Sequence, residues 1–263
     1  MQIDLDNKAT RILVQEYVNR LYSRCSEEEA NYYLYKLIHS FDVLQTAQDL
    51  IQLTKPPLSS TMKRHILDAA ILHDIGRCYE FQNGKKQNID HGKMGAVLIK
   101  KYLPQMKIEQ LTTLFHNKLP SEKDPAKIRP ILNYVRDADM LANIKYQIEY
   151  TELWLNHLLW SVPANKLGIK IDSEIYNASQ NRTQVDAQKV KQHTFLNMLL
   201  SQFCWYYGLK TQAARKIAKR DKLFGRYKKA VCEIVIPRIV KQRKAQNQLI
   251  KEINDLFADP MFN

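Results

Sequence analysis

The sequence predicts an all-α fold, and two observations carry that prediction. Only 7 of the 263 residues are glycine, and the apolar residues recur mostly at steps of three and four rather than in alternation. Steps of three and four place apolar side chains on one face of a helix. Hydrophobic residues make up 45% and charged residues 25% of the chain. These shares are ordinary for globular domains, so neither disorder nor a membrane class is indicated.

Two helices are expected in the first third of the chain. Ser26 and Glu29 have the form of a capping box, which predicts a helix through NYYLYKLIHSFDVLQTAQDLIQL that ends at the following prolines. Ser59 or Ser60 can cap a second helix, MKRHILDAAILHDI. Gly76 is expected to close this helix as a C-terminal glycine.

Three further helices are expected after a polar loop, QNGKKQN. Prolines at 104 and 120 separate them, and Pro125 suits a first helical turn. The three predicted helices are HGKMGAVLIKKYL, IEQLTTLFHNK and PAKIRPILNYVRDADMLANI.

Beyond residue 150 the predicted helices are less regular. The segment 151–160 is expected to be a buried helix, 161–183 to be irregular and 184–208 to be helical. A basic helical stretch should follow from about 210 to 250. Pro237 should kink or interrupt that stretch, and the Ile-Val-Ile sequence before it could equally form a short strand.

Positive charge is concentrated in the C-terminal third. The formal net charge is +13, and residues 182–263 hold 17 Lys and Arg against 6 Asp and Glu. We therefore expect a core at 1–150 and a helical extension at 151–263, packed on the core and strongly basic from about 210. A basic stripe at 210–244 would attract phosphorylated molecules or nucleic acid, although such runs are often solvated helix faces.

The cysteine pattern and the first residues of the sequence bear on the cellular compartment. The four cysteines form no CxxC pair, which argues against a disulfide framework and against a thiolate zinc site. No uncharged apolar run approaches the ~20 residues that span a bilayer, and MQIDLDNK lacks the regions of a signal peptide. We expect a cytoplasmic protein.

A buried ionisable pair is the first candidate for chemistry. His73 and Asp74 lie near the end of the apolar helix segment AAILHDIG. A buried pair of this kind needs a partner charge, and imidazole nitrogen and carboxylate oxygen are standard ligands of zinc, manganese and iron. A core histidine beside a capping aspartate is the alternative that these two residues leave open.

Three other histidines and one aspartate also lie within or at the ends of the predicted helices. His39 lies inside the preceding helix, His91 opens the next one and His116 ends the one after. Asp137 and Asp139 are about 200° apart around a helix, so both cannot face inward. Asp139 shares its side with the apolar positions 128, 132, 135 and 142. It is therefore the expected inward ligand, and Asp137 is expected to be solvated or to lie behind the ligands.

At these positions the sequence resembles the HD-domain superfamily. HD-domain proteins are helical metal-dependent phosphohydrolases with a lone histidine, a His-Asp doublet and a later aspartate, often in an Ala-Asp-x-Leu context. Here these are His39, the doublet in AAILHDIGR, and Asp139 in DADML. Members with dinuclear centres add two histidines, which His91 in DHGKMGA and His116 in FHNK would match. The resemblance covers about residues 25 to 145.

The resemblance implies an HD-type helical bundle whose bound metal activates water as hydroxide against a nucleotide or related phosphorylated substrate. The metal would be a divalent transition ion, two ions in the dinuclear version, chosen from Mn, Fe, Zn, Co and Ni, with Mg also possible. Asp74, as the bridging ligand, and Lys118 are the expected catalytic residues. Arg77, Lys93 and Lys118 are expected to contact substrate phosphate, although each could equally be a surface cation near a helix end. The expected ligands are His39, His73, Asp74, His91, His116 and Asp139.

Three other functions stay open at this point. A nuclease would hold a polynucleotide with the basic C-terminal segment across the same site. A dinuclear iron oxygenase would use the same six ligands to activate oxygen. A binding or regulatory module would retain the metal without turnover, although no ligand is missing from the set.

Overall fold

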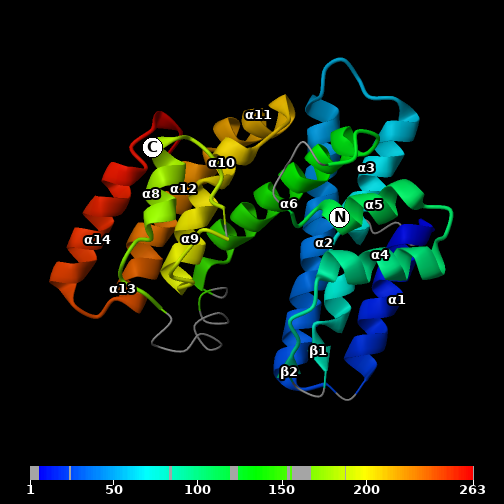
Figure 1. Ribbon diagram of the computed structural model, residues 1–263, viewed down its shortest axis with the longest axis horizontal. Coiled ribbons are helices and arrows are strands. Elements are labelled where there is room, and N and C mark those ends of the chain that lie inside the picture. The colour runs from blue at the N-terminus through cyan, green and yellow to red at the C-terminus, as the bar shows by residue number, and fades with distance from the viewer. Residues whose placement is uncertain are drawn as a thin grey trace. The chain divides into compact units, whose positions relative to one another are not determined.

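A computed structural model describes residues 6–23, 25–82, 85–118, 124–152, 155, 167–186 and 188–262. The fold is all-α, as predicted, with one very short hairpin (Figure 1). The chain divides into two compact units, Met1–Ala142 and Asn143–Asn263. The predicted boundary near 150 lies close to this division, and the packing of the second part on the first stays a prediction.

The first unit contains six helices, a 3-10 helix and the hairpin within its described residues. Helix α6 continues past the division between the units. The elements are α1 (Lys8–Tyr22), α2 (Glu27–Leu53), α3 (Ser60–Leu72), η1 (Ile75–Tyr79), β1 (Phe81–Gln82), β2 (Lys85–Lys86), α4 (His91–Tyr102), α5 (Lys107–Phe115) and α6 (Arg129–Glu149).

The predicted starts of α2 and α3 are confirmed. The Ser26 side chain accepts from the Glu29 backbone N–H, and the Glu29 carboxylate accepts from the Ser26 N–H, which completes the capping box. Ser59 caps α3 by accepting from the Met62 N–H. Helix α1 was not predicted, although the Asn7 side chain caps its first turn.

The predicted role of Gly76 is wrong. Helix α3 ends at Leu72, before the His-Asp pair, and Gly76 lies inside η1 without a left-handed backbone. A Cβ on Gly76 would lie 2.1 Å from the His91 carbonyl oxygen and 2.6 Å from the Gly95 nitrogen. Gly76 is therefore required by the close approach of η1 and α4, and that contact places the first turn of α4 beside the His-Asp turn.

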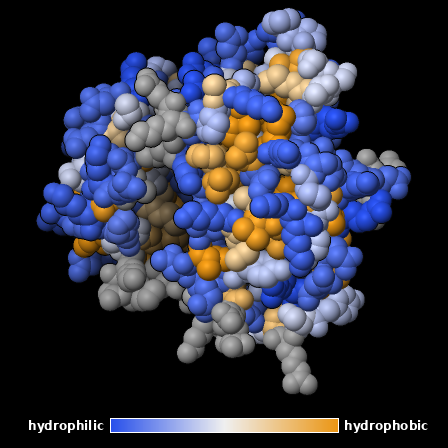
Figure 2. Space-filling model, turned by 45° about the vertical axis from the view of Figure 1, so that its right-hand side comes forward, coloured by the Kyte–Doolittle hydropathy of each residue, from blue (hydrophilic) through white to orange (hydrophobic). Residues whose placement is uncertain are grey.

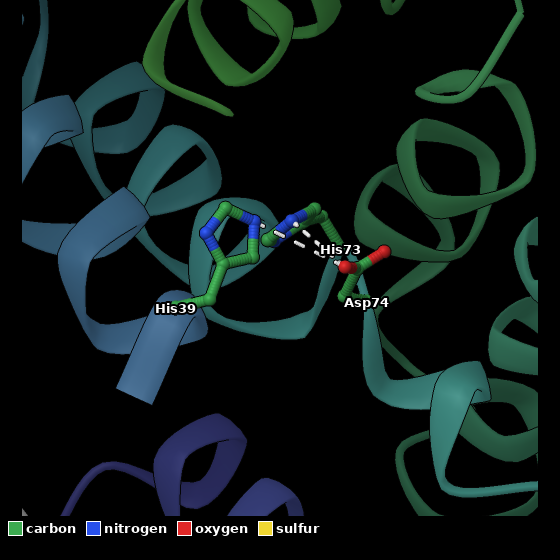
Figure 3. A group of neighbouring side chains, drawn as sticks. All are labelled: His39, His73 and Asp74. Atoms are coloured by element: carbon green, nitrogen blue, oxygen red, sulfur yellow. Dashed lines mark ion pairs between the residues drawn. The ribbon is translucent and has the colours of Figure 1, made fainter. Parts of the chain in front are cut away.

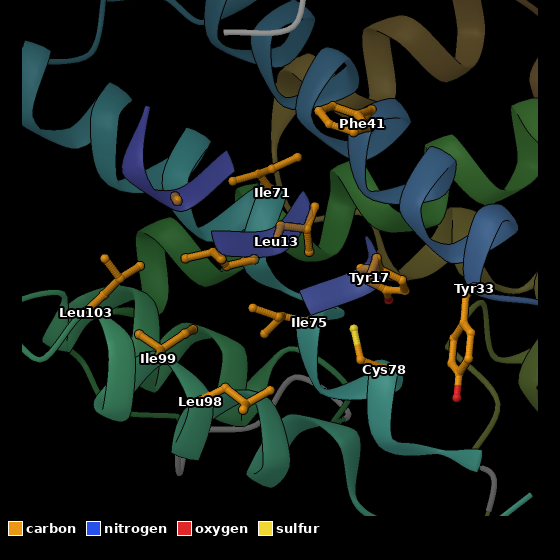
Figure 4. Close-up of a cluster of buried hydrophobic side chains, with 12 residues drawn as sticks. Leu13, Tyr17, Tyr33, Phe41, Ile71, Ile75, Cys78, Leu98, Ile99 and Leu103 are labelled. Atoms are coloured by element: carbon orange, nitrogen blue, oxygen red, sulfur yellow. The ribbon is translucent and has the colours of Figure 1, made fainter. Parts of the chain in front are cut away.

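The hydrophobic core of the first unit lies between α1, α2, α3, η1 and α4 (Figure 4). Leu13 and Tyr17 of α1 are fully buried in it, and so is Ile75 of η1. The Tyr17 hydroxyl also donates to the Asp74 carbonyl oxygen at 3.2 Å. This bond ties the unpredicted first helix to the turn that carries the His-Asp pair.

The loop expected at QNGKKQN contains the hairpin, in which β1 pairs antiparallel with β2 and Phe81 lies opposite Lys86. Residues 83 and 84 lie outside the described residues. Helix α6 begins at Arg129 rather than in the turn that Pro125 opens.

All regular secondary structure in the described residues of the second unit is helical. Its elements are α8 (Ser173–Gln180), α9 (Phe195–Phe203), α10 (Trp205–Gly208), α11 (Gln212–Arg220), α12 (Leu223–Ala230), the π-helix η3 (Val231–Val235), α13 (Ile236–Ile239), α14 (Arg243–Leu256) and the 3-10 turn η4 (Pro260–Phe262). Most of the helix predicted at 151–160 lies outside the described residues.

Three predictions for the second unit are corrected. Helix α8 falls in the segment expected to be irregular, where Asp172 caps it by accepting from the Glu174 N–H. The segment 184–194 is not helical where it is described, and α9 begins only at Phe195. The alternative of a strand before Pro237 is wrong, because the residues before the proline form η3, which runs directly into α13.

The surface carries mostly hydrophilic residues with scattered apolar patches on the face shown in Figure 2. Leu34 and Ile38, one turn apart on α2, are among the exposed hydrophobic side chains. None of the helices in the described part of the chain combines the length and the apolar character that crossing a membrane requires.

Candidate metal site

The six predicted ligands converge in the first unit from five different elements. His39 comes from α2, the His73-Asp74 pair from the turn after α3, His91 from the first position of α4 and His116 from the residue after α5. Asp139 comes from α6. The site therefore exists only because five segments pack together.

The two oxygens of Asp74 face different histidines. Asp74 Oδ2 lies 4.0 Å from His39 Nε2 and 3.7 Å from His73 Nε2 (Figure 3). Asp74 Oδ1 lies 3.5 Å from His91 Nε2 and 3.4 Å from His116 Nε2. The donor atoms thus form two groups that share one carboxylate, and each group is compact enough to hold an ion.

Asp139 adds a second carboxylate to the first group. Its Oδ1 atom lies 3.0 Å from His39 Nε2 and 3.7 Å from His73 Nε2. The predicted inward orientation of Asp139 is therefore consistent with these contacts. The first group presents two imidazoles and two carboxylates, and the second presents two imidazoles and the shared Asp74.

Backbone carbonyls orient two of the histidines. The Nδ1 atoms of His73 and His116 lie 2.7 Å from the carbonyl oxygens of Ala70 and Thr113. An Nδ1–H that donates to a carbonyl leaves the Nε2 lone pair directed at the site, which is the tautomer a metal ligand requires. Among the described side chains, His73 Nε2 and His91 Nε2 are buried without a hydrogen-bond partner. Such unsatisfied buried nitrogens fit a bound cation.

The carboxylates of the site stay charged despite their burial. Burial would raise the pKa of Asp74, but Arg77, Lys36 and His73 outweigh it and hold that pKa well below its usual range. Burial is likewise outweighed at Asp139, where the hydrogen bond with His39 and the neighbouring imidazole of His73 hold the pKa well below its usual range. Charged carboxylates are the form that binds a metal.

The pKa values of two histidines of the site are lowered, and that of a third is raised by its carboxylate neighbours. Burial lowers the pKa of His39, and burial together with Arg77 and His116 lowers the pKa of His91 to about 4. Burial also opposes a charge on His73, but Asp74 and Asp139 outweigh it and raise that pKa. The site thus combines neutral imidazoles with a local negative charge, both of which favour a divalent cation.

Two cations reach Asp74 from inside the protein. Arg77 Nε lies 2.7 Å and Lys36 Nζ 3.3 Å from Asp74 Oδ2. Sequence reasoning expected Arg77 near the site but missed Lys36, which lies one turn before His39 on the same face of α2. A lysine within the otherwise aromatic and aliphatic segment YYLYKLIH was the available signal.

Glu80 is a second residue that sequence reasoning missed. Its Oε1 atom accepts from Arg77 Nη1 at 2.8 Å and lies 3.6 Å from His91 Nδ1, and its Oε2 atom accepts from the Tyr32 hydroxyl. Glu80 thus lies behind His91 while Asp74 lies in front of it. A carboxylate in this place orients the imidazole and raises its basicity toward a metal.

The two lysines predicted to contact phosphate are exposed. Lys93 and Lys118 both lower the pKa of Asp90, although burial of Asp90 opposes them and its hydrogen bonds contribute more. Lys118 Nζ also lies 5.0 Å above the centre of the Phe115 ring. Their positions beside the residue that precedes His91 are compatible with a contact to substrate.

Asp137 is fully buried, so of its two expected positions the solvated one is wrong, and a place behind the ligands stays a prediction. His65 does not join the ligands, because its Nδ1 atom pairs with Glu109 Oε1 at 2.5 Å between α3 and α5. The Asp139 side chain is 28% exposed, so of these two carboxylates on α6 it is Asp137 that is fully buried.

The comparisons with known proteins agree with this site. The family model of the HD domain matches residues 37–144, a segment that contains all six residues. Residues 37–144 therefore form an HD domain, and proteins with this domain are generally metal-dependent hydrolases. No curated protein and no solved structure matches the chain.

Proposed function

We propose that this protein is a phosphohydrolase with a dinuclear metal centre, acting on a nucleotide or a related phosphorylated substrate. One observation carries the proposal: the two oxygens of Asp74 face separate pairs of histidines. A carboxylate in that position can bridge two ions, and one ion alone would leave two of the imidazoles without a partner.

The ligands divide between the two ions. His39, His73 and Asp139 would hold the first ion with Asp74 Oδ2, and His91 and His116 would hold the second with Asp74 Oδ1. Imidazole-rich sets of this kind accept Mn, Fe, Zn, Co or Ni. The first ion would have a complete set of four protein donors, whereas the second would keep positions for water or substrate.

The chain's own residues define what the site can do. When bound, two divalent ions screen the charge of a phosphate ester and lower the pKa of a water molecule. Asp74 sets the separation of the two positions, and Glu80 and the two backbone carbonyls hold the imidazoles in the required orientation. Neutral His39 and His91 leave their nitrogens available over the physiological pH range.

Positive side chains around the site support a phosphorylated substrate. Lys36 and Arg77 lie against Asp74, and the exposed Lys93 and Lys118 are close enough to Asp90 to lower its pKa. Once a metal shares the charge of Asp74, Lys36 is positioned to pair with a phosphate oxygen instead. Lys118 is the exposed group proposed to neutralise charge on the leaving side of the substrate.

The experiment is metal analysis of gently purified protein combined with turnover of phosphate mono- and diesters, including nucleotides, in added Mn, Fe or Mg. We expect near two ions per chain in the wild type, about one in His91→Gln or His116→Gln, and loss of both ions and of turnover in Asp74→Asn. His193→Gln, an exposed histidine of the second unit, is the matched control and should keep both ions.

The outcomes separate this proposal from the other functions. Turnover that requires oxygen and iron indicates the oxygenase, and products of defined length from RNA or single-stranded DNA indicate a nuclease. Stable binding of two ions without turnover of any substrate indicates a binding module. A single ion that survives His91→Gln unchanged contradicts the dinuclear assignment.

A further inference from the structure

Helices α11 and α12 of the second unit expose an almost purely cationic surface. We define the α11–α12 cationic face as the exposed Lys and Arg side chains of these helices and the residue that joins them: Arg215, Lys216, Lys219, Arg220, Lys222, Arg226 and Lys229. We propose that this face binds the phosphate backbone of a nucleic acid.

The helical pattern of α11 separates cations from apolar residues completely. Its buried positions are Ala213, Ala214, Ile217 and Ala218. The exposed positions repeat at one- and three-residue steps, and all except Gln212 carry a positive charge. Successive turns of a helix rise about 5.4 Å, so α11 presents a row of charges rather than a single anion site.

Helix α12 extends the row. Its buried positions are Leu223, Phe224 and Tyr227, while Arg226 and Lys229 are exposed. Two acidic residues offset part of this charge: Asp221 is paired with Arg220 through two hydrogen bonds, and Glu233 Oε2 lies 4.0 Å from Lys229 Nζ. The positive charge of the face is therefore only partly compensated by its own neighbours.

The composition of the face favours a nucleic acid over a membrane. Helices that lie on anionic membranes insert large apolar or aromatic side chains between the lipids. The exposed large hydrophobic residues of the described chain fall outside α11 and α12. The same lack of exposed aromatics removes a platform for base stacking. Recognition should therefore be directed at the backbone, with little preference for sequence.

This proposal is independent of the metal site. The face belongs to the second unit, outside the segment that matches the HD domain. Failure of the binding test would leave the proposed phosphohydrolase untouched, and loss of turnover in a metal-ligand variant would leave the binding proposal untouched.

The expected effect follows from counterion release. Each phosphate neutralised on a single strand contributes about 0.7 to the slope of log K against log salt. Removing three contacts should lower the slope by roughly 2. A slope difference of roughly 2 over the tenfold range from 1 M to about 0.1 M salt corresponds to a factor of roughly 100. Lowering the salt over this range should therefore strengthen binding by the wild type roughly 100-fold more than binding by the variant.

The test is fluorescence anisotropy of the full chain with a labelled single-stranded RNA of about 20 nucleotides, across a salt series. The variant combines Lys216→Gln, Lys219→Gln and Arg226→Gln, which remove three exposed charges and replace them with a good helix former. It avoids Arg215, whose guanidinium donates to the Leu209 carbonyl oxygen. Gel analysis of the recovered RNA checks that it is intact.

The matched control removes the same charge elsewhere in the second unit, through Lys241→Gln, Lys244→Gln and Lys251→Gln, which are all exposed. We expect the control to keep at least a tenfold advantage in affinity over the α11–α12 variant. Equal losses in both variants would reduce the effect to net charge and overturn the proposal.

Two further probes test other partners. Polyglutamate that binds as tightly as RNA and loses affinity in the same variant would indicate an acidic protein and overturn the proposal. Binding of the protein to phosphatidylserine vesicles but not to RNA would indicate a membrane surface as the partner and would also overturn the proposal. Absence of RNA binding at low salt would also overturn it.

Discussion

Adding one methyl group at Gly76 is expected to damage the metal site without removing any ligand. The new Cβ would lie 2.1 Å from the His91 carbonyl oxygen, about 0.9 Å closer than the 3.0 Å that real Cβ atoms respect. The obstacle is backbone on both sides, because the Gly95 nitrogen lies 2.6 Å away. Neither group can move aside as a side chain can, so η1 and α4 must separate.

The magnitude follows from overpacking. Inserting a methyl group into a tightly packed contact costs typically 1–3 kcal/mol, and a rigid backbone obstacle places Gly76→Ala at the upper end, about 3 kcal/mol. For a protein of this size each kcal/mol lowers Tm by roughly 2–4 °C, so Tm should fall by about 6–12 °C. His91 would move with α4, which should also reduce occupancy of the second metal position.

The assay is thermal unfolding by circular dichroism together with metal analysis. Gly92→Ala is the matched control, because its Cβ would approach no atom more closely than the 3.0 Å to the Thr113 carbonyl oxygen. Its Tm should stay within a few degrees of the wild type. A Gly76→Ala protein with unchanged Tm and metal content would refute this reasoning.

Three further predictions concern pH, thiols and substrate. In metal-free protein, the pKa of His91 at about 4 lies below its ordinary 6.5, so the unfolded state binds more protons between these values. The contribution of His91 to the free energy of unfolding, roughly 3 kcal/mol, is present above pH 6.5 and is lost as the pH falls toward 4. Urea unfolding of His91→Gln should show a flatter pH dependence, and equal slopes would contradict the assignment. Burial raises the pKa of Cys232 to about 11, so at pH 8 only ~0.1% is thiolate, and the half-buried Cys25 should react first with Ellman's reagent; equal rates would argue against that burial. Lys36→Met should raise KM by roughly 10–100-fold and leave the metal content unchanged, because it removes a hydrogen bond from a charged group to the substrate. An unchanged KM would show that Lys36 does not contact the substrate.

Local sequence signals determined most of the helices of the first unit. The capping box at Ser26 and the hydroxyl at Ser59 act within one turn, so their effect can be deduced without any tertiary contact. The angle per residue of a helix placed Asp137 and Asp139 on different sides of α6, but it did not by itself determine which of the two is buried. The order of the histidines and aspartates was sufficient to indicate the HD-domain superfamily.

Other features depend on packing between distant segments. Gly76 looked like a helix terminator, yet it is needed because another helix approaches it, and no local signal reports that contact. Asp137 was expected to be solvated or to lie behind the ligands because its side of α6 is opposite Asp139, and tertiary packing buries it fully.

For the site, the sequence by itself determined which residue types are present and on which helices they lie. Only the tertiary structure decided that Asp74 turns one oxygen to each histidine pair, that Lys36 reaches Asp74, and that Glu80 supports His91. The reason is physical: helix periodicity is a local property of the chain, whereas distances between side chains of different helices are set by how those helices pack.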